Sequence, residues 1–195
     1  MSAVKGRKCW LKSNDGTTVK SASELKLLGF IFDEKPDYNK QVTNLIRRAT
    51  KRVFVLNHYS KFMPGEDLKK LYCFLIRLVL DYSCVIYHPQ ISNYQSNRLK
   101  AIQKKCLRLM YGRQKSYGAL LEESGLKTLK SRREEQFVKF AKDTSQNPNY
   151  AHLFPRNNCP VNTRNSKTYK EFFARTDRLY NSPVCAICSK FHTFQ

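Results

Sequence analysis

The chain has 195 residues, 41% of them hydrophobic, which is enough for one folded domain with a buried core and excludes a disordered polycation. It carries 36 Lys and Arg residues against 15 Asp and Glu, a formal net charge of +21. Such an excess repels itself unless an anionic partner offsets it, so nucleic acid and anionic membrane surfaces are the partner classes to consider. The excess is greatest in residues 36–115, which contain 16 basic and 4 acidic residues.

Cysteine content and hydropathy predict an intracellular protein. The seven cysteines are scattered and odd in number, and the first residues show no signal-peptide pattern, so we expect reduced thiols in the nucleus or cytoplasm rather than secretion. The most apolar stretch, residues 71–87, contains Arg77 and Asp81, whereas a membrane span needs about 20 predominantly apolar residues. We therefore expect a buried helix there, with Arg77 and Asp81 placed to pair, and no membrane as partner.

Residues 1–35 are predicted to form a β-hairpin. Asn14-Asp15-Gly16 is typical of a tight turn, and the Thr17-Thr18-Val19 run after it favours extended structure. Residues 25–32 are almost continuously apolar, which predicts one strand covered on both faces. Gly29 in the middle of this strand indicates either a bulge, with a close backbone approach, or a simple kink.

Residues 36–146 are predicted to form a bundle of three to five helices. Helix 37–60 has one apolar stripe, and the carboxylate of Asp37 near its start can cap free N–H groups. Helix 65–86 is apolar on nearly every side, so we place it at the centre of the bundle. Helix 92–111 has one apolar and one basic face and is followed by a glycine, a common helix terminator.

Two further helices and a tail complete the predicted chain. A short helix over 116–123 ends at Gly125, and the capping box Ser131-Arg132-Arg133-Glu134 opens a helix over 132–145. Three residues of the latter helix are predicted to face inward: Phe137, Phe140 and Ala141. Residues 147–195, rich in Pro, Asn, Ser and Thr, are predicted to form an extended, irregular and basic tail. The predicted fold class is therefore mainly α, with an N-terminal β-hairpin, a helical bundle and this tail.

Helices 37–60 and 92–111 each carry a basic face without acidic residues. No Asp or Glu occurs in residues 39–61 or 93–113, whereas solvated helix faces usually mix both signs of charge. Lysine and arginine bind phosphates and gain free energy by releasing condensed counterions. We therefore favour nucleic-acid contact over simple solvation. The candidate phosphate-binding residues are Arg47, Arg48, Lys51, Lys104, Lys105 and Arg108.

The sequence offers no catalytic centre and only one candidate metal site. Cys185-x-x-Cys188-x-x-x-His192 has the spacing of part of a zinc site, but no second cysteine pair completes it, and one cysteine-bearing turn of an apolar helix explains the pattern better. The histidines fit no Ser or Cys triad signature. The chain also has neither a Gly-rich phosphate loop nor adjacent aspartates for two metal ions. We expect no catalytic residues, no bound metal and no cofactor.

Five segments of the chain together carry a family resemblance. They are Leu27-Leu28-Gly29 with Ile31-x-Asp33, Ala49-x-Lys51-Arg52, Leu80-Asp81-Tyr82-Ser83 with His88-Pro89, Ile102-Gln103-Lys104-Lys105, and Arg164-Asn165-Ser166-Lys167 with Arg175-Thr176-Asp177-Arg178. In this order they resemble the C-terminal part of the reverse transcriptase of LINE-type (non-LTR) retrotransposons, in the jockey-like and CR1-like range. The match runs over residues 10–183, and it departs from the family at Phe172, where Pro is common, and after Pro183.

The resemblance implies both a fold and a function. It implies that residues 1–35 are a palm–thumb junction, with Leu28, Gly29 and Phe30 in the primer-grip position, and that residues 36–146 are a polymerase-like thumb. The family's enzyme copies RNA into DNA with divalent ions held by palm aspartates, and that aspartate pair is absent from this sequence.

We therefore expect a non-catalytic fragment of an RNA-directed DNA polymerase of a transposable element, which binds the backbone of an RNA/DNA hybrid or duplex. Magnesium, and the palm and fingers as further partners, would belong to an intact element protein. Two alternatives stay open. One is an inert relic of a decayed element, and the other is a zinc-dependent interaction protein that uses the cysteines around Cys185.

Overall fold

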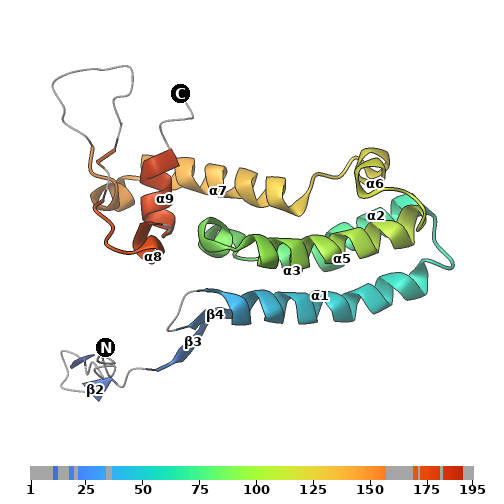
Figure 1. Ribbon diagram of the computed structural model, residues 1–195, viewed down its shortest axis with the longest axis horizontal. Helices are drawn as coiled ribbons and strands as arrows, with labels where there is room; N and C mark the ends of the chain where they lie inside the picture. The colour runs from blue at the N-terminus through green and yellow to red at the C-terminus, as the bar shows by residue number, and fades with distance from the viewer. Residues whose placement is uncertain are drawn as a thin grey trace, which may run out of the picture.

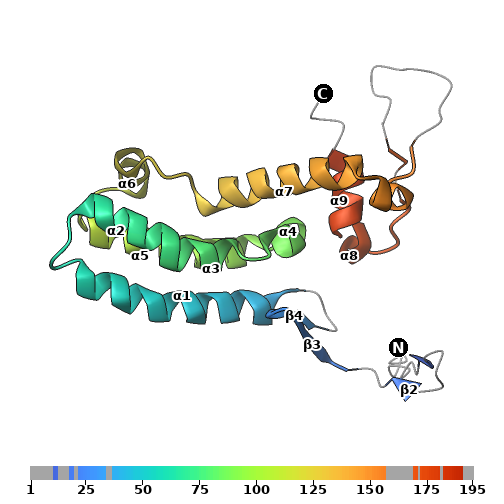
Figure 2. The same ribbon diagram turned by 180° about the vertical axis from the view of Figure 1, so that it is seen from behind.

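The computed structural model describes residues 11–12, 18–19, 22–33, 37–156, 169–170, 172–180 and 182–190. As predicted, the protein is mainly α, with short antiparallel strands at the N-terminal side followed by a helical bundle. The long helices α1 (Asn39–Tyr59), α5 (Asn93–Tyr111) and α7 (Leu129–Gln146) run along the long axis of the molecule in three tiers, with α5 in the middle (Figure 1). Helix α2 (Gly65–Tyr72) packs against α5 in this middle tier (Figure 2).

The predicted N-terminal hairpin is confirmed in its strands. Strand β1 (Leu11–Lys12) pairs antiparallel with β2 (Thr18–Val19). The predicted turn, Asn14-Asp15-Gly16, lies between these strands and outside the described residues.

The apolar run that follows forms a second hairpin, so the prediction of a single strand over 25–32 was wrong. Strand β3 (Glu24–Leu27) pairs antiparallel with β4 (Phe30–Asp33). Leu28 and Gly29 form the turn with φ angles of +49° and +81°. Two consecutive positive φ values are typical of the two-residue turns whose twist matches that of the flanking strands. Gly29 is therefore a turn residue rather than a bulge, and all four residues of β3 are exposed rather than covered.

Strand β4 attaches this second hairpin to the bundle. Phe30 is only 2% exposed, and the buried side chain of Gln41 on α1 accepts a hydrogen bond from the backbone N–H of Ile31 at 3.1 Å. At the turn, the hydroxyl of Tyr82 donates to the carbonyl of Leu28. The hairpin is thus held at its inner strand and at its tip, while β3 lies on the outside.

The central segment, predicted as one helix over 65–86, is divided into several pieces. Helix α2 continues through the π-helical turn η1 (Cys73–Arg77) into α3 (Leu78–Asp81), and α4 (Cys84–Tyr87) follows after a break. Helices α1, α5 and α7 cover this segment on three sides. The remaining side is not covered, and the side chains of Phe74 and Leu78 are 75% and 57% exposed. The prediction that this helix is buried on all sides was therefore wrong.

The predicted Arg77–Asp81 pair is not formed. The carboxylate of Asp81 accepts hydrogen bonds from Arg132 on α7 instead, the shorter at 2.8 Å. The neighbouring Arg133 is 1% exposed and donates to the hydroxyl of Ser96 on α5 at 2.9 Å. The two arginines, which the sequence placed in a capping box, fasten α7 to the middle tier.

Helix α7 begins earlier than predicted and has a narrower buried face. The hydroxyl of Thr128, not that of Ser131, is the N-terminal cap, and it accepts from the Ser131 N–H at 3.1 Å. Phe137 and Ala141 are buried as predicted, but Phe140 is 41% exposed. The buried residues of α7 follow a four-residue spacing, which puts Phe140 on the flank of the helix.

Two buried glutamines join α5 to its neighbours. Gln95 closes a capping box at the start of α5, and its side-chain amide donates to the Asp37 carbonyl and to the Asn39 side chain, both at 2.7 Å. The side chain of Gln103 accepts from the hydroxyl of Tyr117 at 2.8 Å and so holds α6 (Tyr117–Ser124). Helix α6 ends at Gly125, as predicted.

The C-terminal segment is less irregular than the prediction of a tail over 147–195. The 3-10 helix η3 (Pro148–Leu153) follows α7, and the helices α8 (Asp177–Tyr180) and α9 (Pro183–Lys190) come later. Ile187 and Cys188 of α9 pack with Phe137 and Phe154 in a second apolar cluster. Helix α9 is therefore part of the packed structure at one end of α7 (Figure 2).

We expect Gln95→Ala to lower the free energy of unfolding by about 1–3 kcal/mol, because the substitution removes the hydrogen bonds by which the buried Gln95 side chain joins the starts of α1 and α5. Urea unfolding followed by circular dichroism measures this loss. Gln114→Ala is the matched control, since Gln114 is exposed and a surface change is worth within about 0.5 kcal/mol. Equal stability of the two variants would contradict the role assigned to Gln95.

We also expect stability to fall in alkali. Burial raises the pKa of the Cys84 and Cys106 thiols to about 12, whereas unfolded thiols ionise near about pH 8.5. The unfolded chain releases these protons at lower pH than the folded chain does. The free energy of unfolding should therefore decrease from about pH 8.5 upward, and each of the two thiols should contribute about 1.4 kcal/mol per pH unit to this decrease. Urea midpoints across this range test the expectation. The Cys84→Ala/Cys106→Ala variant should show a shallower decline.

Candidate nucleic-acid interface

The three predicted phosphate-binding residues of α1 are all exposed but point to two sides. Five apolar residues form the face that packs into the bundle: Val42, Leu45, Ala49, Val53 and Leu56. At about 100° per residue, Arg47 and Lys51 lie opposite this face. Arg48 lies on the flank toward η1, the same side on which the guanidinium of Arg52 donates to the Leu75 carbonyl. Arg47 and Lys51 thus belong to one surface and Arg48 to another.

The three predicted residues of α5 share one outward surface. The helix buries the side that carries Leu99, Gln103 and Leu107, and the predicted cations lie away from that side. Lys105 and Arg108 are exposed, and Lys104 is half-buried. The three cations line a shallow hollow of about 490 Å³ together with Ala101, Leu109 and Arg113.

Helices α1 and α5 pack side by side and run in the same direction (Figure 1). Near their N-terminal ends, the guanidinium of Arg98 on α5 donates to the hydroxyl of Thr43 on α1 at 3.3 Å. Arg47 lies one turn beyond Thr43, and Lys105 lies two turns beyond Arg98. Cations from both helices therefore follow the surface seam at which the helices meet.

None of the six predicted residues is in an ion pair within the part of the chain that the structure describes. Other cations of the protein do form ion pairs, with nitrogen–oxygen distances of 2.7 to 2.9 Å. These pairs are Lys69–Glu66, Lys70–Asp67, Lys115–Glu123, Lys127–Glu135 and Arg132–Asp81. These contacts neutralise charge locally, whereas the six predicted residues keep theirs. The positive potential of α1 and α5 is therefore available to an anion from solution.

Lys40 is also exposed on the outward side of α1, but its environment differs. Its ammonium lies 2.9 Å from the carboxylates of both Asp33 and Glu24. Hydrogen bonds that the ammonium donates to Asp33, and secondly to Glu24, raise the pKa of Lys40 above its ordinary value. Lys40 thus links the β3–β4 hairpin to α1 and adds little to the free positive charge.

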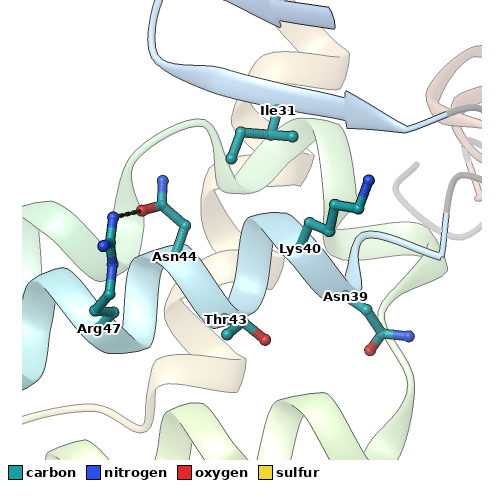
Figure 3. Close-up of a pocket in the computed structure, with 6 residues that line it drawn as sticks. All are labelled: Ile31, Asn39, Lys40, Thr43, Asn44 and Arg47. Atoms are coloured by element: carbon teal, nitrogen blue, oxygen red, sulfur yellow. Dashed lines mark hydrogen bonds between the residues drawn. The ribbon is translucent and has the colours of Figure 1, made fainter. Parts of the chain in front are cut away.

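A hollow of about 390 Å³ lies between β4 and the first half of α1 (Figure 3). Ile31 projects into it from the strand, and Lys40 and Asn44 point toward it from the helix (Figure 3). The guanidinium of Arg47 donates to the side-chain oxygen of Asn44 at 3.3 Å, which holds Arg47 at the edge of the hollow. Arg47 therefore connects this hollow with the row of cations along the seam.

The structure separates the three residues that the resemblance placed in the primer grip. Leu28 is 85% exposed at the tip of the hairpin, next to Gly29. Phe30 is buried, with its ring centroid 4.7 Å from that of Phe32 and 5.9 Å from that of Tyr38. Only Leu28 and Gly29 are thus placed to touch a ligand, and Phe30 acts in the core.

The described residues contain no group of three or more His, Cys, Asp or Glu side chains that could hold a metal ion. Cys185 and Cys188 are buried in α9, and His192 lies outside the described residues. In the same part of the chain no single helix is long and apolar enough to cross a membrane. One pair of helical segments bent by 44°, Gly65–Asp81 with Cys84–Gln90, reaches that length and composition jointly.

Exposed aromatic rings accompany the cations, and the sequence reasoning did not single them out. Phe54 on α1 is 70% exposed, Phe62 just after α1 is 75% exposed, and Tyr94 on α5 is 69% exposed. The guanidinium of Arg98 lies 5.7 Å from the ring centroid of Tyr94. A signal was present, because Phe54 falls outside the apolar stripe of its helix and thus on the basic side.

Comparison of the chain with protein-family models, with curated proteins and with solved structures finds no match. The family resemblance therefore rests on the five sequence segments alone. The geometry and charge of the interface are the remaining guide to function.

We expect the unpaired cations to reduce the stability of the free protein by mutual repulsion. Raising NaCl from low to moderate concentration screens exposed charges and should raise the melting temperature by a few degrees, about 2–4 °C for each kcal/mol gained. In the Arg47→Gln/Lys51→Gln/Lys105→Gln variant this rise should be smaller. Differential scanning fluorimetry across salt concentrations measures it. A rise as large as that of the wild type would show that these cations do not repel one another appreciably.

Proposed function

We propose that this protein binds the sugar–phosphate backbone of a nucleic-acid duplex, with little preference for sequence, through the cations of α1 and α5. One observation carries the proposal: exposed Lys and Arg side chains without ion-pair partners in the described part of the chain line two adjacent helices. Contacts to phosphates fix the position of a protein on a duplex but carry no sequence information. The expected partner is therefore any duplex of sufficient length.

The dimensions of the helices support this proposal. Helix α1 has 21 residues and is therefore about 30 Å long, while each strand of a duplex presents a phosphate about every 3.4 Å. Several phosphates can thus lie along the seam at once. The packing of α1 and α5 on one another keeps both rows of cations in place, so binding requires little ordering of the backbone.

The resemblance to a retrotransposon reverse transcriptase supports a more specific form of the proposal. A polymerase thumb holds its template and primer by their backbones, so the duplex would be an RNA/DNA hybrid or DNA. We propose a thumb-like, non-catalytic role for this chain. Synthesis of DNA would require the palm aspartates, which this sequence lacks.

The outer strand of the second hairpin favours a second candidate function. Leu25 and Leu27 on β3 are 58% and 54% exposed, and Leu28 at the turn is 85% exposed. An exposed apolar edge strand is suited to pair with or pack against another protein domain. The chain would then act only as one part of a larger polymerase and would be inert by itself.

A salt titration tests the proposed duplex binding. The logarithm of the association constant should fall linearly with the logarithm of salt concentration, with a slope of about −0.9 per phosphate contact on B-form DNA. The variant Arg47→Gln/Lys51→Gln/Lys105→Gln should reduce the magnitude of that slope by about 2–3. Fluorescence anisotropy with a labelled blunt duplex of mixed sequence provides the measurement.

The matched control is Lys70→Gln/Lys115→Gln/Lys127→Gln, which loses the same formal charge at three exposed lysines that are already paired with carboxylates. We expect this control to keep the wild-type slope. If both triple variants lowered the slope equally, binding would depend on the net charge of the protein and not on the cations of α1 and α5. A folded wild-type chain that does not bind at low salt would overturn the proposal and favour the second candidate.

A further inference from the structure

Helix α1 ends in a group of aromatic side chains that the duplex-binding role does not use. We define this aromatic cluster as Phe54, His58, Tyr59 and Phe62. The rings of His58 and Phe62 lie 5.9 Å apart between centroids, and those of His58 and Tyr59 lie 5.5 Å apart. All four residues are exposed, with Phe54 at 70% and Phe62 at 75%. The cluster is therefore a surface feature and not part of the core.

The aromatic cluster continues the basic surface of α1. Phe54 and His58 follow Lys51 by three and seven residues along α1. At about 100° per residue, these spacings place all three side chains on the side of the helix opposite the buried face. Lys61 stands next to Phe62 at the other end of the cluster and is also exposed. No acidic residue occurs between Asn39 and Lys61. Along the chain, the exposed rings thus lie close to Lys51 and Lys61, and the helix that carries most of them has no acidic residue of its own.

The chemistry of this arrangement fits an unpaired nucleic-acid strand. Proteins that bind single strands combine cations along the backbone with aromatic side chains on which bases stack. Bases inside a duplex cannot offer their faces to a protein side chain because they are stacked on one another. Lys51 and Phe54 are about 4.5 Å apart along the helix axis, which is comparable with the axial rise of about 3.4 Å per nucleotide in one strand of a duplex. A cation and a ring are therefore spaced to serve the same or adjacent nucleotides.

We propose that the aromatic cluster binds unpaired bases that adjoin the duplex held by α1 and α5, so that the preferred ligand is a duplex with a single-stranded extension. This inference rests on the proposed function, because the cations of the seam supply the duplex contact. The C-terminal end of α5, the helix that carries Arg108, lies at the same end of the parallel helix pair as the C-terminal end of α1 (Figure 1). The extension leaves the duplex at that end.

Binding of two matched ligands tests the inference. One is a blunt duplex, and the other is the same duplex with a short single-stranded extension. For the wild-type protein, anisotropy at constant salt should show about 5- to 100-fold tighter binding of the extended ligand, since stacking contributes about 1–3 kcal/mol per base. In Phe54→Ala/Phe62→Ala this preference should disappear, while affinity for the blunt duplex stays at the wild-type value.

The control variant is Phe74→Ala, which removes a phenylalanine that is also 75% exposed but lies on the central segment, away from the basic seam. We expect Phe74→Ala to keep the preference for the extended ligand. Phe54→Tyr/Phe62→Tyr should keep it as well, because the aromatic faces remain. A result in which the two alanine variants behave alike would overturn the inference.

The possible failures can be told apart. If neither ligand binds, the proposed duplex binding itself is wrong. If the blunt duplex binds with the expected salt dependence and the extension adds nothing, only the role of the aromatic cluster is overturned. If sedimentation shows a dimer of the wild-type chain that Phe54→Ala/Phe62→Ala dissociates, the cluster is a self-association surface, and the inference is again overturned.

Discussion

The parallel packing of α1 against α5 is the constraint on which the rest of the structure depends. The buried side chain of Gln95 joins the starts of both helices by hydrogen bonds to the Asp37 carbonyl and the Asn39 side chain, so the two helices cannot slide past one another without breaking them. The central segment and α7 then pack on the remaining sides. Because the apolar stripes of α1 and α5 face inward, the cations of these two helices lie on the surface.

This arrangement explains how a chain with a net charge of +21 can form a compact core. Seven of the described carboxylates are paired, six with lysines and one with Arg132, the contact that fastens α7. They therefore do not offset the charge of the seam. The positive charge is concentrated where two rigid helices hold it, and an anion that binds there relieves repulsion that the free protein has to tolerate. The same distribution of charge is therefore compatible with a stable core and supports the proposed binding of phosphates.

Sequence periodicity was sufficient for α1, α5 and α6, but not for the division of the central segment, for α9 or for the details that depend on neighbouring elements. Local signals predicted that α6 ends at Gly125, because a glycine that terminates a helix acts within one turn. They also predicted the basic faces, because the 3.6-residue repeat of a helix is visible over a few residues. The hairpin at Leu28 and Gly29 was missed because a continuous apolar run looks like one buried strand, and only the two positive φ angles show the turn. The partner of Asp81 was missed for another reason: Arg132 lies on a helix 51 residues away, and sequence spacing alone favours the nearer Arg77.

The docking of α9 has a consequence for the order in which the protein forms. Helix α9 contacts α4 across about 100 residues of sequence, and together with α7 it buries Phe137 and Phe154. On the ribosome the α1–α5 seam can assemble while the C-terminal residues are still being made, because all of its contacts come from earlier residues. The second cluster closes only when α9 emerges. Until then, the nascent chain presents an apolar surface that a chaperone would recognise, beside a basic surface that is already complete.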